Sequence, residues 1–60
     1  MTTTQIRKIL REHFGARRYR ITAGGEIHVY GRMPNTNEYG WYLFGWLRSS
    51  GTEARINALS

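Results

Sequence analysis

The sequence predicts an α+β fold, a single domain in which an N-terminal helix packs on one face of a three-stranded antiparallel meander. Three observations indicate this fold. A stripe of apolar residues at helical spacing opens the chain, two strand-like runs flank a glycine-rich turn, and an aromatic run follows a segment rich in turn residues. With sixty residues, the chain is long enough for one small domain with a thin core.

The first element is a helix predicted over residues 3–14. Thr2 is suited to cap its start, and Gln5 lies three residues on, where it completes a capping box. Gly15 follows as a suitable C-cap. The apolar stripe that should face the sheet consists of Ile6, Ile9, Leu10, His13 and Phe14.

Residues 17–22 and 26–32 are predicted to form a hairpin. A two-residue turn at Gly24 and Gly25 would scatter the aliphatic side chains over both faces, whereas a three-residue loop, 23–25, sorts them. We therefore prefer the longer loop, with a glycine in the left-handed conformation. The face toward the helix then carries Tyr19, Ile21, Ile27 and Val29. The opposite face, the arginine face, carries Arg18, Arg20, His28, Tyr30 and Arg32.

Residues 33–39 are rich in turn-forming side chains and should project from the sheet before a third strand over 41–47. Gly45 suggests which side of this strand meets the helix, because a glycine lets a neighbouring backbone approach closely. The residues that share its side are Trp41, Leu43 and Leu47. The residues that would join the arginine face are Tyr42, Phe44 and Trp46.

The pattern weakens after Leu47. Ile56 and Leu59 are three residues apart, which allows two short helical turns, although so short a helix is marginal without packing. We therefore expect residues 1–47 to form the compact domain, and residues 48–60 to form a linker followed by a short helix or a frayed tail.

Composition narrows the class of partner. Nine Lys and Arg against four acidic residues give a formal net charge of +5, and all of the cations except Lys8 are arginine, whose planar fork suits phosphate and aromatic rings. The chain has no cysteine, which favours the cytoplasm, and no apolar run is long enough to span a bilayer. We expect a homo-oligomer, because so small a domain with surface aromatic rings is helped by a second copy that covers part of Tyr42, Phe44 and Trp46.

Enzymatic chemistry is not expected, nor is a cofactor or a metal. The chain contains no Asp for a catalytic triad and no glycine-rich phosphate loop. His13 and His28 lie on different elements, with His13 expected to pack within the apolar stripe and His28 on the arginine face. Without cysteine, a zinc site would need both histidines together with some of the four glutamates.

The predicted order, one helix, three strands and a possible second helix, resembles that of the double-stranded-RNA-binding domain and of HicA-type toxins, which are small ribonucleases. The toxins carry a catalytic histidine in a Gly-Ser-His context on the second strand, whereas residues 25–28 here have no serine before His28. The RNA-binding family has a Lys-Lys-type motif at the start of its last helix, and residues 51–54 lack it.

A second resemblance covers about residues 15–45. The segments 25–31, 33–37 and 40–42 are similar to those of small uncharacterised proteins encoded by bacteriophages and prophages. This resemblance implies a bacterial cytoplasm. It also implies either nucleic-acid binding or the blocking of a host or defence protein.

The arginine face is the candidate binding site, because phosphates are bound by Arg and unstacked bases by flat rings. The leading interpretation is a small phage-type protein that contacts nucleic acid through this sheet face. The alternative is a phage-encoded, anti-CRISPR-like inhibitor that docks on a host or defence protein through the same aromatic strand, since arginine and aromatic residues are also enriched in protein interfaces. In either case the expected binding residues are Arg18, Arg20, His28, Tyr30, Arg32, Tyr42, Phe44 and Trp46.

Overall fold

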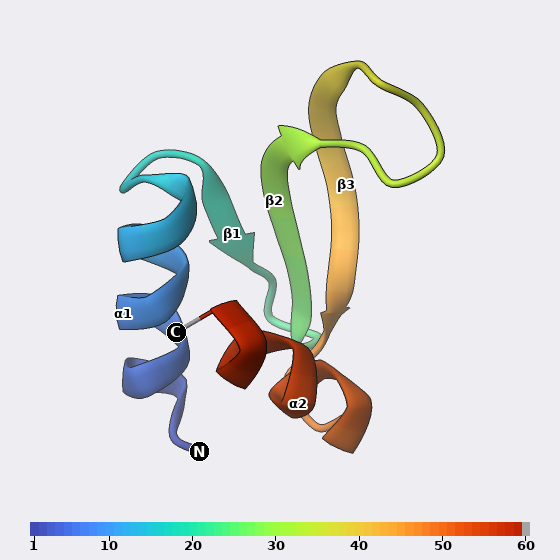
Figure 1. The fold of residues 1–60 in the computed structure, drawn as a ribbon. Helices are drawn as coiled ribbons and strands as arrows, with labels where there is room; N and C mark the ends of the chain where they lie inside the picture. The colour runs from blue at the N-terminus through green and yellow to red at the C-terminus, as the bar shows by residue number, and fades with distance from the viewer. Residues whose placement is uncertain (60) are drawn as a thin grey trace.

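The computed structural model describes residues 1–59 and has the α+β architecture predicted from the sequence. Its three strands form one antiparallel sheet in the order β1-β2-β3 (Figure 1). None of the described helices is long and apolar enough to cross a bilayer. In chain order the elements are α1 (Thr3–Phe14), β1 (Tyr19–Ile21), β2 (Glu26–Arg32), β3 (Tyr39–Trp46) and α2 (Ser50–Leu59).

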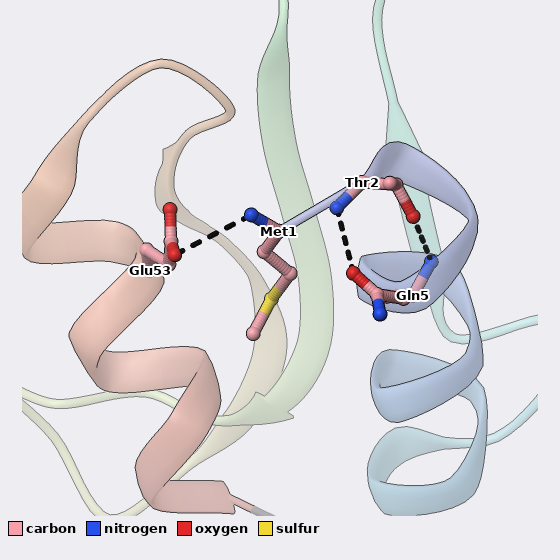
Figure 2. Close-up of polar contacts among 4 residues, drawn as sticks. All are labelled: Met1, Thr2, Gln5 and Glu53. Carbon is pink, nitrogen blue, oxygen red and sulfur yellow. Dashed lines mark hydrogen bonds and ion pairs between the residues drawn. The ribbon is translucent and has the colours of Figure 1, made fainter.

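Helix α1 begins with the capping box that the sequence predicts. The Thr2 hydroxyl accepts a hydrogen bond from the Gln5 backbone N–H at 3.1 Å, and Gln5 Oε1 accepts one from the Thr2 N–H at 2.8 Å (Figure 2). The amino group of Met1 lies 3.5 Å from Glu53 Oε1 on α2, so the start of α1 lies beside α2. Because the Glu53 side chain is about half exposed, this ion pair contributes little stability.

The first hairpin has the register that sorts its side chains by polarity. Ile21 pairs with Ile27 across the sheet, and the Thr22 N–H donates to the Glu26 carbonyl at 2.9 Å. The three-residue loop 23–25 is therefore confirmed. Gly25 has φ of 86°, a conformation that costs little only for a residue without a Cβ, as the turn requires.

Strand β3 contains a β-bulge that the sequence analysis did not predict. Ile27 pairs with Gly45 but His28 pairs with Leu43, so Phe44 is an extra residue on β3. Two consecutive residues, Phe44 and Gly45, are consequently buried on the helix side.

The bulge overturns part of the predicted facing of β3. Trp41 and Leu43, which we expected on the helix side, are 44% and 40% exposed on the opposite side. Tyr42 and Phe44, expected on the arginine face, pack in the core instead, because the extra residue shifts the alternation between them and Trp46. Trp46 does face away from the helices, and Leu47 does pack against the core, as predicted.

Both helices cover the same face of the sheet, and the core lies between them and the strands β2 and β3 (Figure 1). Helix α2 belongs to this core even though its sequence pattern is weak, because Ile56 is fully buried there. The buried apolar residues are Ile6, Leu10, Ile27, Val29, Phe44 and Ile56. Apolar residues packed around them are Ile9, Phe14, Tyr19, Ile21, Tyr42, Leu47 and Leu59.

Candidate functional site

The face of the sheet turned away from both helices, here called the outer face, gathers most of the arginine and aromatic side chains of the strands. Strand pairing defines it: Tyr30 lies opposite Trp41, and His28 lies between Arg20 and Leu43. The outer face consists of Arg18, Arg20, Glu26, His28, Tyr30, Arg32, Tyr39, Trp41, Leu43 and Trp46.

Two arginines lie over aromatic rings on this face. The guanidinium carbon of Arg18 is 5.0 Å from the centroid of the Tyr30 ring, and that of Arg20 is 5.2 Å from the Trp41 ring. The Tyr30 and Trp41 rings meet edge to face, with centroids 5.8 Å apart. In a contact of this kind the negative face of the aromatic ring attracts the guanidinium group and holds it in place. The two pairs thus form one continuous array of alternating charge and flat apolar surface.

A hollow of about 350 Å³ lies beside this array, lined by Arg20, Thr22, His28 and Trp41. Its walls combine a guanidinium, an imidazole, a hydroxyl and an indole ring, so it offers hydrogen-bond donors for an anion next to a stacking surface. The imidazole of His28 has a carboxylate in reach, because its Nε2 is 3.9 Å from Glu26 Oε1. A hollow of this size is at the small end of ligand pockets.

Arg32 marks the far end of the outer face. Its Nη2 donates a hydrogen bond to Asn37 Oδ1 at 3.1 Å, and Asn37 belongs to the loop between β2 and β3. Tyr39 lies opposite Arg32 and is 68% exposed. The loop therefore orients the third arginine of the face, at a distance from the two that lie over rings.

Helix α2 holds the bulge that turns Trp46 outward. The backbone N–H of Trp46 donates a hydrogen bond to Thr52 Oγ1 at 3.1 Å. Arg55 Nη1 donates one to the Phe44 carbonyl at 2.6 Å, and the Arg55 guanidinium carbon lies 4.5 Å from the centroid of the Phe44 ring. A Cβ at Gly45 would overlap the Thr52 side chain. Gly45 thus allows a close approach, as predicted, but to α2 and not to α1.

Six of the eight binding residues expected from the sequence lie on the outer face; the other two, Tyr42 and Phe44, do not. Sequence reasoning missed Tyr39, Trp41 and Leu43. The signal that could have found them is Gly45, because an isolated glycine within a strand often marks a bulge. The six residues brought together are Arg18, Arg20, His28, Tyr30, Arg32 and Trp46.

The second histidine is separate from this face. His13 is exposed near the end of α1 and was wrongly expected to pack within the apolar stripe; its ring touches the edge of the Phe14 ring, with centroids 4.8 Å apart. Within residues 1–59, no three side chains of the types that bind metals lie close enough together to hold an ion.

Comparison of the chain with protein-family models, with curated proteins and with solved structures found no match. The resemblances to phage proteins, to the double-stranded-RNA-binding domain and to HicA-type toxins therefore stay predictions from the sequence. Any assignment of function rests on the geometry of the outer face.

Proposed function

We propose that this protein binds single-stranded nucleic acid through its outer face. The observation that carries the proposal is the pair of arginine–ring contacts, Arg18 with Tyr30 and Arg20 with Trp41, side by side on a sheet face that neither helix covers. Phosphates require guanidinium groups and unstacked bases require flat rings, and this arrangement supplies both. The net charge of +5 favours association with a polyanion.

The exposure of the rings favours single strands over duplexes. Trp41 is 44% exposed and Trp46 is 50% exposed, so both indoles have free surface for stacking. A base within a duplex is already stacked and cannot use such a surface, whereas a single strand can place its bases on the sheet. The hollow beside Arg20 and His28 is suited to receive a phosphate next to the base stacked on Trp41.

Titration of a labelled oligonucleotide at several salt concentrations tests the proposal. Replacing Arg18 and Arg20 together by Gln should weaken binding to many sequences alike and reduce the slope of log affinity against log salt by about 1.4, at about 0.7 per lost phosphate contact. Trp41→Ala should weaken binding by about 1–3 kcal/mol, which is the value of one stacked base.

The matched control is a second double variant that removes the same positive charge from another part of the surface. Arg7 and Arg11 are exposed on α1, away from the outer face, and their double replacement by Gln should leave the salt slope close to that of the parent. The proposal fails if the two double variants lose affinity equally, or if the parent binds no oligonucleotide at low salt.

A protein partner is the second candidate, and one observation favours it. Exposed Tyr39, Trp41, Leu43 and Trp46 follow one another along β3, and an exposed apolar row of this kind is common in protein interfaces. In this alternative the chain is a phage-type inhibitor of a host or defence protein in the bacterial cytoplasm, a setting that the sequence resemblance alone implies. Affinity would then change little with salt, and capture from a bacterial lysate would be insensitive to nuclease.

A further inference from the structure

Strand β3 lies at the edge of the sheet. The N–H and C=O groups of its successive residues alternately bond to β2 and point away from the sheet. The Met33 N–H donates to the Glu38 carbonyl at 3.0 Å, which places the neighbouring pairs Gly31–Gly40 and Val29–Tyr42 among the hydrogen-bonded ones. The backbone groups between them, those of Tyr39, Trp41 and Leu43, consequently point outward from the sheet.

Helix α2 closes one end of this edge and leaves the other end open. Thr52 accepts the Trp46 N–H, and Arg55 donates to the Phe44 carbonyl, so the edge is occupied where the bulge lies. Within residues 1–59 no further strand lies beyond β3, and the outward groups of residues 39–43 face none. The open stretch is therefore bounded by α2 at one end and by the loop 33–38 at the other (Figure 1).

The open stretch lacks the features that usually prevent edge-to-edge pairing. Strand β3 contains no charged residue and no proline, although the whole chain carries a net charge of +5. Two copies of such a chain repel each other at most surfaces. The backbone edge of β3 presents no charge of its own to a second copy, and the Arg20 guanidinium that lies over the Trp41 ring belongs to β1 and to the outer face, not to this edge.

The open stretch is also self-complementary. Its outward groups, on residues 39, 41 and 43, are symmetric about Trp41. An antiparallel second copy would therefore place Tyr39 opposite Leu43 and Trp41 opposite its own equivalent, with every outward N–H and C=O paired. On the helix side, Gly40 would lie opposite Tyr42 and leave space for the tyrosine ring, because a glycine has no side chain.

We propose that two copies of this chain pair through the β3 edge, antiparallel and centred on Trp41, so that their two three-stranded sheets become one continuous sheet. The two-fold axis is perpendicular to the sheet, and both outer faces lie on the same side. This dimer differs from the one expected from the sequence, because it leaves Trp46 uncovered and does not use Tyr42 or Phe44 as surface residues. It does not depend on nucleic-acid binding.

Charge substitution at the two-fold position tests the proposal by analytical ultracentrifugation without nucleic acid. Trp41→Lys should weaken self-association at least about tenfold, because it places two like charges directly opposite one another and adds them to the Arg20 guanidinium that lies over position 41 in each copy. Trp41→Glu should weaken self-association less, because Arg20 of the same copy offsets part of its charge. An equimolar mixture of the two variants should recover the dimer as a heterodimer, because the opposed charges are then of opposite sign. Gln5→Lys, on the exposed side of α1, is the control and should associate like the parent.

A second measurement reports the register and confirms that each variant is folded. With one copy isotope-labelled and the other not, the Gly40 Hα of one copy should show a nuclear Overhauser effect to the Tyr42 Hα of the other, since non-hydrogen-bonded pairs approach to about 4.5 Å between Cα atoms. Circular dichroism of the dilute variants should match that of the parent. The proposal is overturned if the parent is monomeric at millimolar concentration, or if the lysine variant dimerises as the parent does. It is equally overturned if the Trp41 amide becomes protected only when an extended segment of another protein is bound.

Discussion

Strand β2 pairs regularly with β1 and irregularly with β3, and the two pairings differ in what determines them. In the β1–β2 hairpin, Tyr19 and Ile21 flank Arg20 and pair with Val29 and Ile27, so only one register buries the apolar side chains and leaves the charges in water. Along β3 every side chain other than glycine is aromatic or leucine. Whichever set of β3 side chains faced the helices, a similar apolar area would be buried. The difference between apolar and charged side chains that fixes the register of the β1–β2 hairpin is therefore missing from the β2–β3 hairpin.

The bulge at Phe44 decides the facing of β3. It allows Phe44 and Gly45 to meet the helices in succession, with Phe44 in contact with Arg55 and Gly45 in contact with Thr52. It also returns Trp46 to the outer face, where Trp41 already lies. Helix α2 therefore determines, from the buried side of the sheet, which rings are offered on the other side.

The largest expected loss of stability tests whether β3 is bulged or regular. Phe44→Ala should lower the free energy of unfolding by about 3–5 kcal/mol, because the ring is 5% exposed within the core. Trp46→Ala removes a larger side chain from a half-exposed position and should cost less than about 1 kcal/mol. Urea denaturation of the two variants measures both values. A reversed order would mean that β3 alternates regularly and that Phe44 lies on the outer face.

A second pair of substitutions tests the same contrast between the two faces of the sheet, with a leucine on each side of it. Leu10 is fully buried between α1 and the sheet, so Leu10→Ala should cost about 2–5 kcal/mol. Leu43 is 40% exposed on the outer face, and Leu43→Ala should cost less than about 1 kcal/mol. Thermal unfolding followed by circular dichroism, at low concentration so that self-association plays no part, compares the two. Equal losses would show that Leu43 is packed within the single chain and does not lie on the outer face.

The sequence alone predicts the elements whose evidence is local. The bounds of α1, its capping box and the loop 23–25 follow from residue types at fixed spacings, and the structure has all three. The arginine side of the candidate site follows from the same register, which places Arg18, Arg20 and His28 on one face. These features depend on neighbours within a few residues along the chain.

The sequence does not predict the features that depend on tertiary contacts. Helix α2 has no clear apolar stripe, and it is held by Ile56 in the core and by the contacts of Thr52 and Arg55 with β3. The bulge depends on those same contacts: Gly45 marks a bulge as possible, but the contacts of Thr52 and Arg55 with β3 decide that Phe44 turns inward and Trp41 outward. Two of the aromatic residues predicted on the arginine face, Tyr42 and Phe44, consequently pack toward the helices instead.

A smaller effect is expected where α2 meets the bulge. Gly45→Ala should cost about 1–3 kcal/mol, because the added Cβ would overlap the Thr52 side chain and force α2 away from β3. Thr52→Ala loses the hydrogen bond from the Trp46 N–H and should cost about 1 kcal/mol. In the double variant the two closest overlaps, with Thr52 Oγ1 and Cγ2, are removed and only the tight contact with the Cβ of residue 52 remains. The loss of the double variant should therefore be smaller than the sum of the two single losses by about 1 kcal/mol. Additive losses in urea denaturation would show that the two residues are not in contact.

The smallest expected loss of stability concerns the regular β1–β2 hairpin, where the backbone conformation of one turn residue fixes the register. Gly25 has φ of 86°, and a Cβ there would meet Leu47 only at an ordinary contact distance of 3.9 Å, so Gly25→Ala should cost about 1–2 kcal/mol through backbone strain alone. Gly25→Asn should recover part of this loss, because asparagine tolerates the left-handed region. The adjacent Gly24 has no positive φ, and a Cβ there would also meet a side chain, Thr22 Oγ1, at an ordinary contact distance of 3.9 Å. Gly24→Ala is therefore the matched control and should change stability by less than about 1 kcal/mol. Equal destabilisation by the two alanine variants in thermal unfolding would place the turn at Gly24-Gly25 and shift the register, which would remove Arg20 from its position opposite His28.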